Sequence, residues 1–157
     1  MKKILTICLL VAITCAVNAQ QKPTKEETIA FMNRTLKSTI GFEGMGGKVI
    51  EIDFNQNTYT KKTYYDLAGG FYSNYIISGI PWDKLEANKF EVRGLNLRIF
   101  FSQGYRHQYK VDDRPEKIEF ISSLDITLPS DKIESFKKAC IRLCEIYKEE
   151  NKDPFKN

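Results

Sequence analysis

The sequence is poor in the residues that most often carry catalysis or bind metals. Its 157 residues include one histidine, one tryptophan and four cysteines. A structural zinc site needs about four Cys, His or carboxylate ligands, and a histidine base needs a nucleophile and an orienting carboxylate beside it. The Gly-x-Ser-x-Gly and Gly-Lys-Ser/Thr patterns are also missing from the chain. We therefore expect no cofactor and no metal, and the balance leans away from an enzyme.

Long apolar runs are scarce as well. The one such run is Ile4–Val17, which follows Lys2 and Lys3 and leads into small residues that end at Ala19. This is the pattern of a signal peptide, residues 1–19, and the run is short for a membrane span. A lipoprotein with an acylated Cys15 is disfavoured, because no small residue directly precedes that cysteine. We expect an exported protein, periplasmic or secreted, without a transmembrane segment.

Charge of one sign does not accumulate anywhere. Removal of residues 1–19 leaves 138 residues and two fewer lysines, so the formal net charge falls from +4 to +2. Basic and acidic residues are interspersed, which gives no electrostatic argument for nucleic acid as a partner. The length suits one domain over residues 20–150, followed by a polar tail over residues 151–157.

The last third of the chain has the clearest pattern. A predicted strand over Lys117–Leu128 is followed by a predicted helix over Asp131–Glu150, with Ser130 as its expected cap. Alternation places these strand residues on one inward face: Ile118, Phe120, Leu124, Ile126 and Leu128. Helical spacing gathers these residues into one apolar stripe: Ile133, Phe136, Cys140, Leu143, Cys144 and Tyr147. A stripe of this width must be buried against another layer.

Earlier segments predict a helix and then strands. Thr24 to Glu27 fits a capping box, and Gly41 ends the helix it opens. Its predicted inner face holds Ile29, Met32, Leu36 and Ile40. Turn signals then separate predicted strands at 48–54, 58–65, 71–80, 89–93, 95–101 and 105–111. Short strands joined by hairpin turns imply an antiparallel sheet.

The expected fold is therefore α+β. We expect a curled antiparallel sheet or partly open barrel of about seven strands, with an N-terminal helix and a long C-terminal helix. A flatter sheet with both helices on one face is the alternative. The order of seven strands and then a helix, over roughly residues 48–150, resembles the pleckstrin-homology-like superfold. The resemblance rests on element order alone, and the extra first helix departs from the minimal pattern.

Cys140 and Cys144 are the only cysteines that follow the predicted signal peptide. Four residues apart on a helix, they lie close together, but their side chains are poorly directed for a disulfide. We favour packing within the apolar stripe over a disulfide, and place a metal or redox role last.

Exposed aromatic side chains are the most plausible binding feature, although filling of the sheet core is the favoured role for most of them. Tyrosine offers an apolar ring and a polar tip, which suits binding surfaces. Alternation puts the lone His107 on one strand face with two tyrosines. The residues we expect to contact a ligand are Tyr72, Trp82, Tyr105, His107 and Tyr109.

These observations favour an exported, non-enzymatic module that binds an unidentified small molecule or protein. A small periplasmic hydrolase, with carboxylates brought together in space, is the second hypothesis. An envelope inhibitor or assembly subunit is the third. The sequence does not indicate an oligomeric state.

Overall fold

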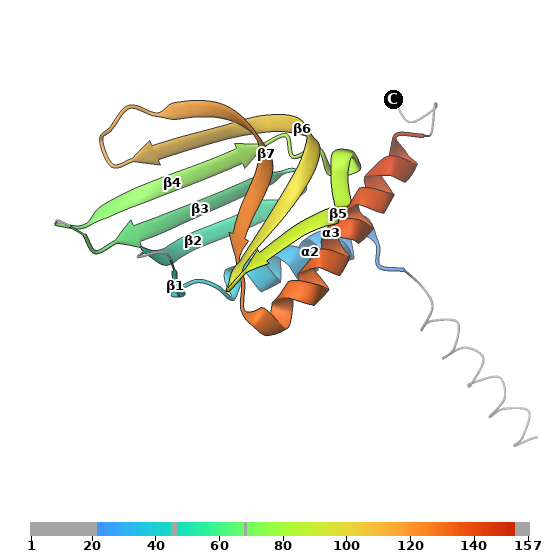
Figure 1. Ribbon diagram of the computed structural model, residues 1–157, viewed down its shortest axis with the longest axis horizontal. Helices are drawn as coiled ribbons and strands as arrows, with labels where there is room; N and C mark the ends of the chain where they lie inside the picture. Colours follow the sequence, from blue (N-terminus) through green and yellow to red (C-terminus); the bar gives the residue numbers. More distant parts are fainter. Residues whose placement is uncertain (1–21, 45–46, 68, 153–157) are drawn as a thin grey trace, which may run out of the picture.

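The computed structural model describes residues 22–44, 47–67 and 69–152. The fold is α+β, with two long helices packed against a curled antiparallel sheet that forms a half-barrel (Figure 1). None of the helices in these three stretches has the length and apolar character of a membrane-spanning segment. The predicted signal peptide lies outside the described residues, as do residues 153–157 of the predicted tail.

The first helix, α2, spans Lys25–Lys37 and starts as the sequence predicts. The Thr24 side chain accepts a hydrogen bond from the Glu27 amide at 3.2 Å, and the Glu27 carboxylate accepts one from the Thr24 amide at 2.9 Å. These two bonds satisfy donors that the first helical turn leaves unpaired. The helix ends earlier than expected, so the prediction that Ile40 faces inward is wrong, and its side chain is 49% exposed.

The strands follow in one connected sheet. Their bounds are β1 Glu43–Gly44, β2 Gly47–Asn55, β3 Thr58–Tyr65, β4 Phe71–Ser78, β5 Leu85–Arg93, β6 Asn96–Val111 and β7 Lys117–Thr127. A short 3₁₀ helix, η1, spans Trp82–Lys84 between β4 and β5. All pairs are antiparallel. Strands β1 to β4 pair in chain order, β4 then pairs with β6, and β6 also pairs with β5 and β7.

The sheet bends at β6, where the sequence predicted two strands separated by a turn. The structure has one strand instead, and its register with β7 shifts between Phe100 and Tyr105. Four residues of β6, 101–104, lie opposite the single residue Ser122 of β7. The half before this bulge pairs with β5, and the half after it pairs with β4. The sequence-based division into seven strands is therefore corrected here, because residues with turn composition form a bulge.

The last helix, α3, spans Ser130–Glu150 and packs against α2, η1 and β5. In Figure 1 the two helices lie together at one end of the strands, and the β6–β7 hairpin extends away from them. The predicted stripe faces the core, with Ile133, Phe136, Cys140, Leu143 and Cys144 buried and Tyr147 half-buried. The predicted cap is wrong: Pro129 occupies the N-cap position, and no side chain caps the helix.

The predicted inward face of β7 is right for only half of the strand. Leu124, Ile126 and Leu128 are buried, whereas Ile118 and Phe120 are 52% and 80% exposed. The bulge in β6 explains the difference. Before it, the buried residues of β6 pair with Leu124 and Ile126, while after it the buried Tyr105 pairs with Ile121. The inward positions on β7 thus change from even-numbered to odd-numbered residues.

Candidate functional site

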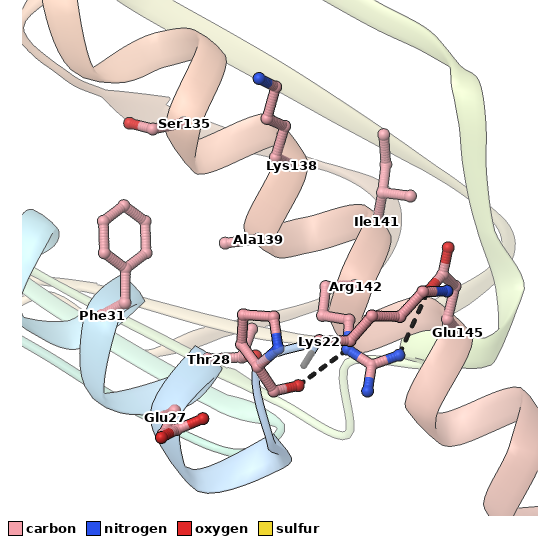
Figure 2. A pocket seen from close by; sticks show the side chains of 11 residues that line it. Lys22, Glu27, Thr28, Phe31, Ser135, Lys138, Ala139, Ile141, Arg142 and Glu145 are labelled. Carbon is pink, nitrogen blue, oxygen red and sulfur yellow. Dashed lines mark hydrogen bonds and ion pairs between the residues drawn. The ribbon is translucent and has the colours of Figure 1, made fainter. Parts of the chain in front are cut away.

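A groove of about 640 Å³ lies between the two helices and the segment that leads into α2 (Figure 2). The residues that line it come from all three: Lys22, Pro23, Glu27, Thr28, Phe31, Ser135, Lys138, Ala139, Ile141, Arg142 and Glu145. The Phe31 ring points from α2 toward the side of α3 that carries Ser135 and Ala139. Apolar atoms of Phe31, Ala139 and Ile141 give the groove a surface that water solvates poorly.

The α3 side of the groove follows from helical spacing. Ser135, Ala139 and Arg142 recur at intervals of four and three residues, so they share one face of the helix. That face adjoins the buried stripe, but it mixes small, apolar and charged residues. A mixed face of this kind looks like an ordinary solvated surface in the sequence, and for that reason sequence reasoning missed the groove.

An ion pair and a hydrogen bond to the backbone hold the leading segment against α3. Arg142 donates from Nε to the carbonyl oxygen of Pro23 at 2.8 Å and from Nη1 to Glu145 at 3.2 Å, while Lys22 Nζ lies 3.1 Å from the same Glu145 oxygen. Hydrogen bonds from Lys22 and Arg142 lower the pKa of Glu145 below its usual range. The carboxylate is therefore ionised and occupied. Lys22 and Pro23 form one wall of the groove through these contacts.

Three of the predicted ligand-contacting residues meet on the inner side of the sheet. His107 pairs with Ile77 and Tyr109 pairs with Tyr75 across β4 and β6. The Tyr75 ring stacks on His107 at 5.2 Å between centroids and lies 4.7 Å from the ring of Tyr109. Tyr105 is on the same strand face but is 2% exposed. We call Tyr75, Tyr105, His107 and Tyr109 the sheet-face cluster.

Several buried polar atoms in and beside this cluster have no hydrogen-bond partner among the described residues. They are the hydroxyls of Tyr59, Thr63, Ser73 and Tyr105 and both ring nitrogens of His107. Burial lowers the pKa of His107, against the opposing effect of Glu119, so the ring is neutral at pH 7. Burial also raises the pKa of Tyr75 to about 12. His107 and Tyr75 are thus uncharged at pH 7, and the charged group beside them is Lys61, which pairs with Tyr75 across β3 and β4 and whose Nζ lies 5.3 Å from the centroid of the Tyr75 ring. Neither ring nitrogen of His107 bonds to a carboxylate among the described residues, as a hydrolytic triad would require.

The other two predicted ligand-contacting residues lie elsewhere. Tyr72 is 43% exposed and packs against Tyr64, at 5.1 Å between ring centroids, on the opposite side of β4 from Tyr75. Trp82 is fully buried, donates from Nε1 to the carbonyl oxygen of Gln56 at 2.8 Å and packs edge-on against Phe54. The structure therefore brings together Tyr105, His107 and Tyr109, but neither Tyr72 nor Trp82 joins them.

The two cysteines, and the adjacent acids Asp112-Asp113 and Glu149-Glu150, show no arrangement for catalysis among the described residues. Cys140 and Cys144 are free and buried, and burial raises the pKa of the Cys140 thiol. Asp112 accepts a hydrogen bond from the Tyr72 amide, and Glu150 pairs with Lys25. Within residues 22–44, 47–67 and 69–152, no group of three or more His, Cys, Asp or Glu side chains is arranged to hold a metal ion.

Comparison of the chain with protein-family models, with curated proteins and with solved structures gave no significant match. We therefore describe the class of protein by the architecture of this chain alone. It is an α+β module with a curled antiparallel sheet, two helices that pack together and a groove between those helices.

Proposed function

We propose that this protein is an exported module that binds a small amphipathic molecule in the groove between α2 and α3. The observation that carries the proposal is the groove itself. Its volume of about 640 Å³ lies within the range of roughly 300–1,000 Å³ that is usual for small-molecule sites. Phe31, Ala139 and Ile141 supply the apolar lining that such sites use for most of their contact area.

The charges at the rim favour an anionic head group. Both acidic side chains there are occupied, because Glu27 accepts from the Thr24 amide and Glu145 accepts from Lys22 and Arg142. Lys138 extends from α3 at the rim (Figure 2) and forms no ion pair among the described residues. An apolar body with one negative charge, such as a long-chain fatty acid, matches this arrangement.

Direct binding tests the proposal. A sixteen-carbon fatty acid and the alcohol of the same length would be titrated in parallel by calorimetry, so that the two probes differ in the charged head. We expect both probes to bind, and the acid to bind more tightly than the alcohol. Lys138→Glu should weaken binding of the acid by about tenfold and leave the affinity for the alcohol unchanged.

A pair of tryptophan variants separates the groove from the remaining surface. Ser135→Trp places a large ring in the groove and should abolish binding of both probes, because the ring takes the space of the ligand. Lys148→Trp adds the same ring at an exposed position of α3 outside the groove and should bind normally. Equal affinity in the two variants, or no binding to the unmodified protein, would contradict the proposal.

Export is supported by the signal-peptide pattern of residues 1–19. Its test is the mass of the protein recovered outside the cytoplasm, which should correspond to a chain that begins at Gln20. Recovery of the full-length chain in the cytoplasm would contradict it.

The pleckstrin-homology-like order of elements is likewise a proposal. It is supported by the passage of β7 directly into α3 and by the packing of α3 in the core with the sheet. The position of β6, which pairs with β4, β5 and β7, departs from a simple succession of hairpins. Superposition of an experimental structure on a pleckstrin-homology-like domain tests the proposal. If the C-terminal helices of the two structures did not superpose, the proposed resemblance would be wrong.

A further inference from the structure

The outer edge of β7 is a strand edge with exposed apolar side chains. Strand β7 pairs with β6 along one edge, and no other strand in the described part of the chain pairs with it. In the half of β7 that lies beyond the bulge, Ile118 and Phe120 are 52% and 80% exposed. An exposed, apolar strand edge is a site where another strand can add by main-chain hydrogen bonds.

Ile118 shares its side of the sheet with an exposed apolar residue of β4, two strands away. Gln108 of β6 pairs with Ile118 on one side and with Ile76 of β4 on the other. Ile76 is 38% exposed and therefore lies on the same outer face as Ile118. Two exposed isoleucines thus flank Gln108 on this face, the outer one lies at the edge of the sheet, and no layer covers them in the described structure.

The charges along the edge are arranged to match a second copy of the same strand. Lys117 and Glu119 flank Ile118 and carry opposite charges. If two copies pair in antiparallel fashion about a twofold axis at Ile118, each Lys117 faces the other copy's Glu119 and the two Ile118 side chains face each other. Phe120 then lies diagonally opposite the other Ile118, within reach of its side chain. A register centred on Glu119 would instead place two carboxylates opposite each other.

We propose that two copies of this chain associate through antiparallel pairing of β7, which extends the sheet across a twofold axis at Ile118. Charged residues on a strand edge often prevent such pairing, and two like charges placed directly opposite each other destabilise a strand pair. Here the alternation of sign is self-complementary, which selects this chain over an unrelated strand. The edge shares no residue with the groove between α2 and α3, so either proposal can fail without the other.

Charge reversal tests the pairing. Sedimentation equilibrium of the protein without its signal peptide should show a monomer–dimer equilibrium. Lys117→Glu and Glu119→Lys each replace two attractive pairs with two repulsive ones, and each should weaken dimerisation by about tenfold or more. The double variant Lys117→Glu/Glu119→Lys exchanges the charges, restores both pairs and should restore the dimer. A loss of folding in a single variant would appear as a change in its circular dichroism, and the double variant provides the readout in that case.

Crosslinking tests the register. Two residues directly opposite each other in an antiparallel pair lie about 4.5–5.5 Å apart at Cα, a separation that a disulfide spans. Ile118→Cys should therefore form a covalent dimer under mild oxidation. Ile76→Cys is the matched control, because it is exposed on the same face two strands away from the edge and should stay monomeric.

Each result decides the proposal. A dimer that is disrupted by either single reversal and restored by the double variant supports it, as does a disulfide specific to Ile118→Cys. A protein that sediments as a monomer at every accessible concentration overturns it. So does a dimer that both single reversals leave unchanged, a double variant that stays monomeric, or equal crosslinking through Ile76→Cys.

Discussion

Replacement of Tyr59 by phenylalanine should stabilise the protein, although the same change at a hydrogen-bonded tyrosine is normally destabilising. Tyr59 is 2% exposed in the core, and its hydroxyl has no partner among the described residues. An unsatisfied buried polar group destabilises the folded state by about 1–3 kcal/mol, because the unfolded chain hydrogen-bonds the group to water. Tyr59→Phe removes this penalty and keeps the ring.

The expected gain is at the lower end of that range. Loss of one oxygen atom also removes some packing contacts, so we expect a net increase of about 1 kcal/mol in the free energy of unfolding. For a domain of this size such a change raises Tm by about 3–5 °C. Tyr72→Phe is the matched control, since Tyr72 is on the neighbouring strand but 43% exposed, and it should change stability very little.

Urea unfolding measures this effect. The only tryptophan, Trp82, is fully buried, so its fluorescence reports loss of the core. A higher midpoint at an unchanged slope would show a change in stability alone. If Tyr59→Phe instead lowered the free energy of unfolding by about 1 kcal/mol or more, the hydroxyl must be hydrogen-bonded in the folded protein, and the reasoning would be refuted.

Tyr59 should also make the stability of the protein depend on pH in the alkaline range. Burial raises the pKa of Tyr59 in the folded protein, whereas in the unfolded chain it is about 10. Ionisation of Tyr59 therefore leaves the free energy of unfolding unchanged below pH of about 10 and lowers it as the pH rises above that value, because Tyr59 loses its proton first in the unfolded state. The pKa of Tyr75 and of Tyr105 shifts in the same direction, so Tyr59→Phe should flatten the alkaline slope without abolishing it.

Two further predictions concern His107 and Cys140. Burial lowers the pKa of His107, so its contribution to the free energy of unfolding should be complete above pH of about 6.5 and should fall as the pH drops through the lowered pKa. NMR titration of this single histidine should give a pKa below about 6.5, and a pKa at or above that value would contradict the burial argument. Burial keeps the Cys140 thiol protonated, so an alkylating reagent should not modify it until the protein is unfolded. Rapid modification of Cys140 in the folded protein would contradict a free buried thiol. So would the absence of Cys140 from the count of free thiols in the unfolded protein without reductant.

Both helices could be predicted from the sequence because their signals are local. The Thr24–Glu27 capping box and the apolar stripe from Ile133 to Cys144 depend on residues within a few turns of one another. The strands from Lys48 to Ser78 were also recognisable from alternation and turn residues. The early end of α2 was missed, because Gly41 marks the end of the connecting turn and the last helical residue is Lys37.

Features that depend on distant segments could not be predicted in this way. Alternation within β6 placed Tyr105, His107 and Tyr109 on one face, but Tyr75, whose ring packs against His107 and Tyr109, comes from a strand that is not adjacent in sequence. The groove depends on how α2 and the Lys22–Pro23 segment lie against α3, and its lining residues have no distinctive pattern on either helix. Trp82, an expected binding residue, is buried in the core and donates a hydrogen bond to the carbonyl oxygen of Gln56, which is distant in sequence.

The bulge in β6 links the sheet-face cluster to the proposed dimer edge. Side chains alternate across a strand, so an insertion changes the side on which later residues lie only if it adds an odd number of residues. Residues 101–104 face one residue of β7, a surplus of three. Beyond the bulge, buried Tyr105 therefore pairs with odd-numbered Ile121, and Ile118 and Phe120 are left on the outer side. An even surplus would have kept both residues inward, as the unbroken alternation of β7 predicts, and the odd-numbered Lys117, Glu119 and Ile121 would have faced outward in their place.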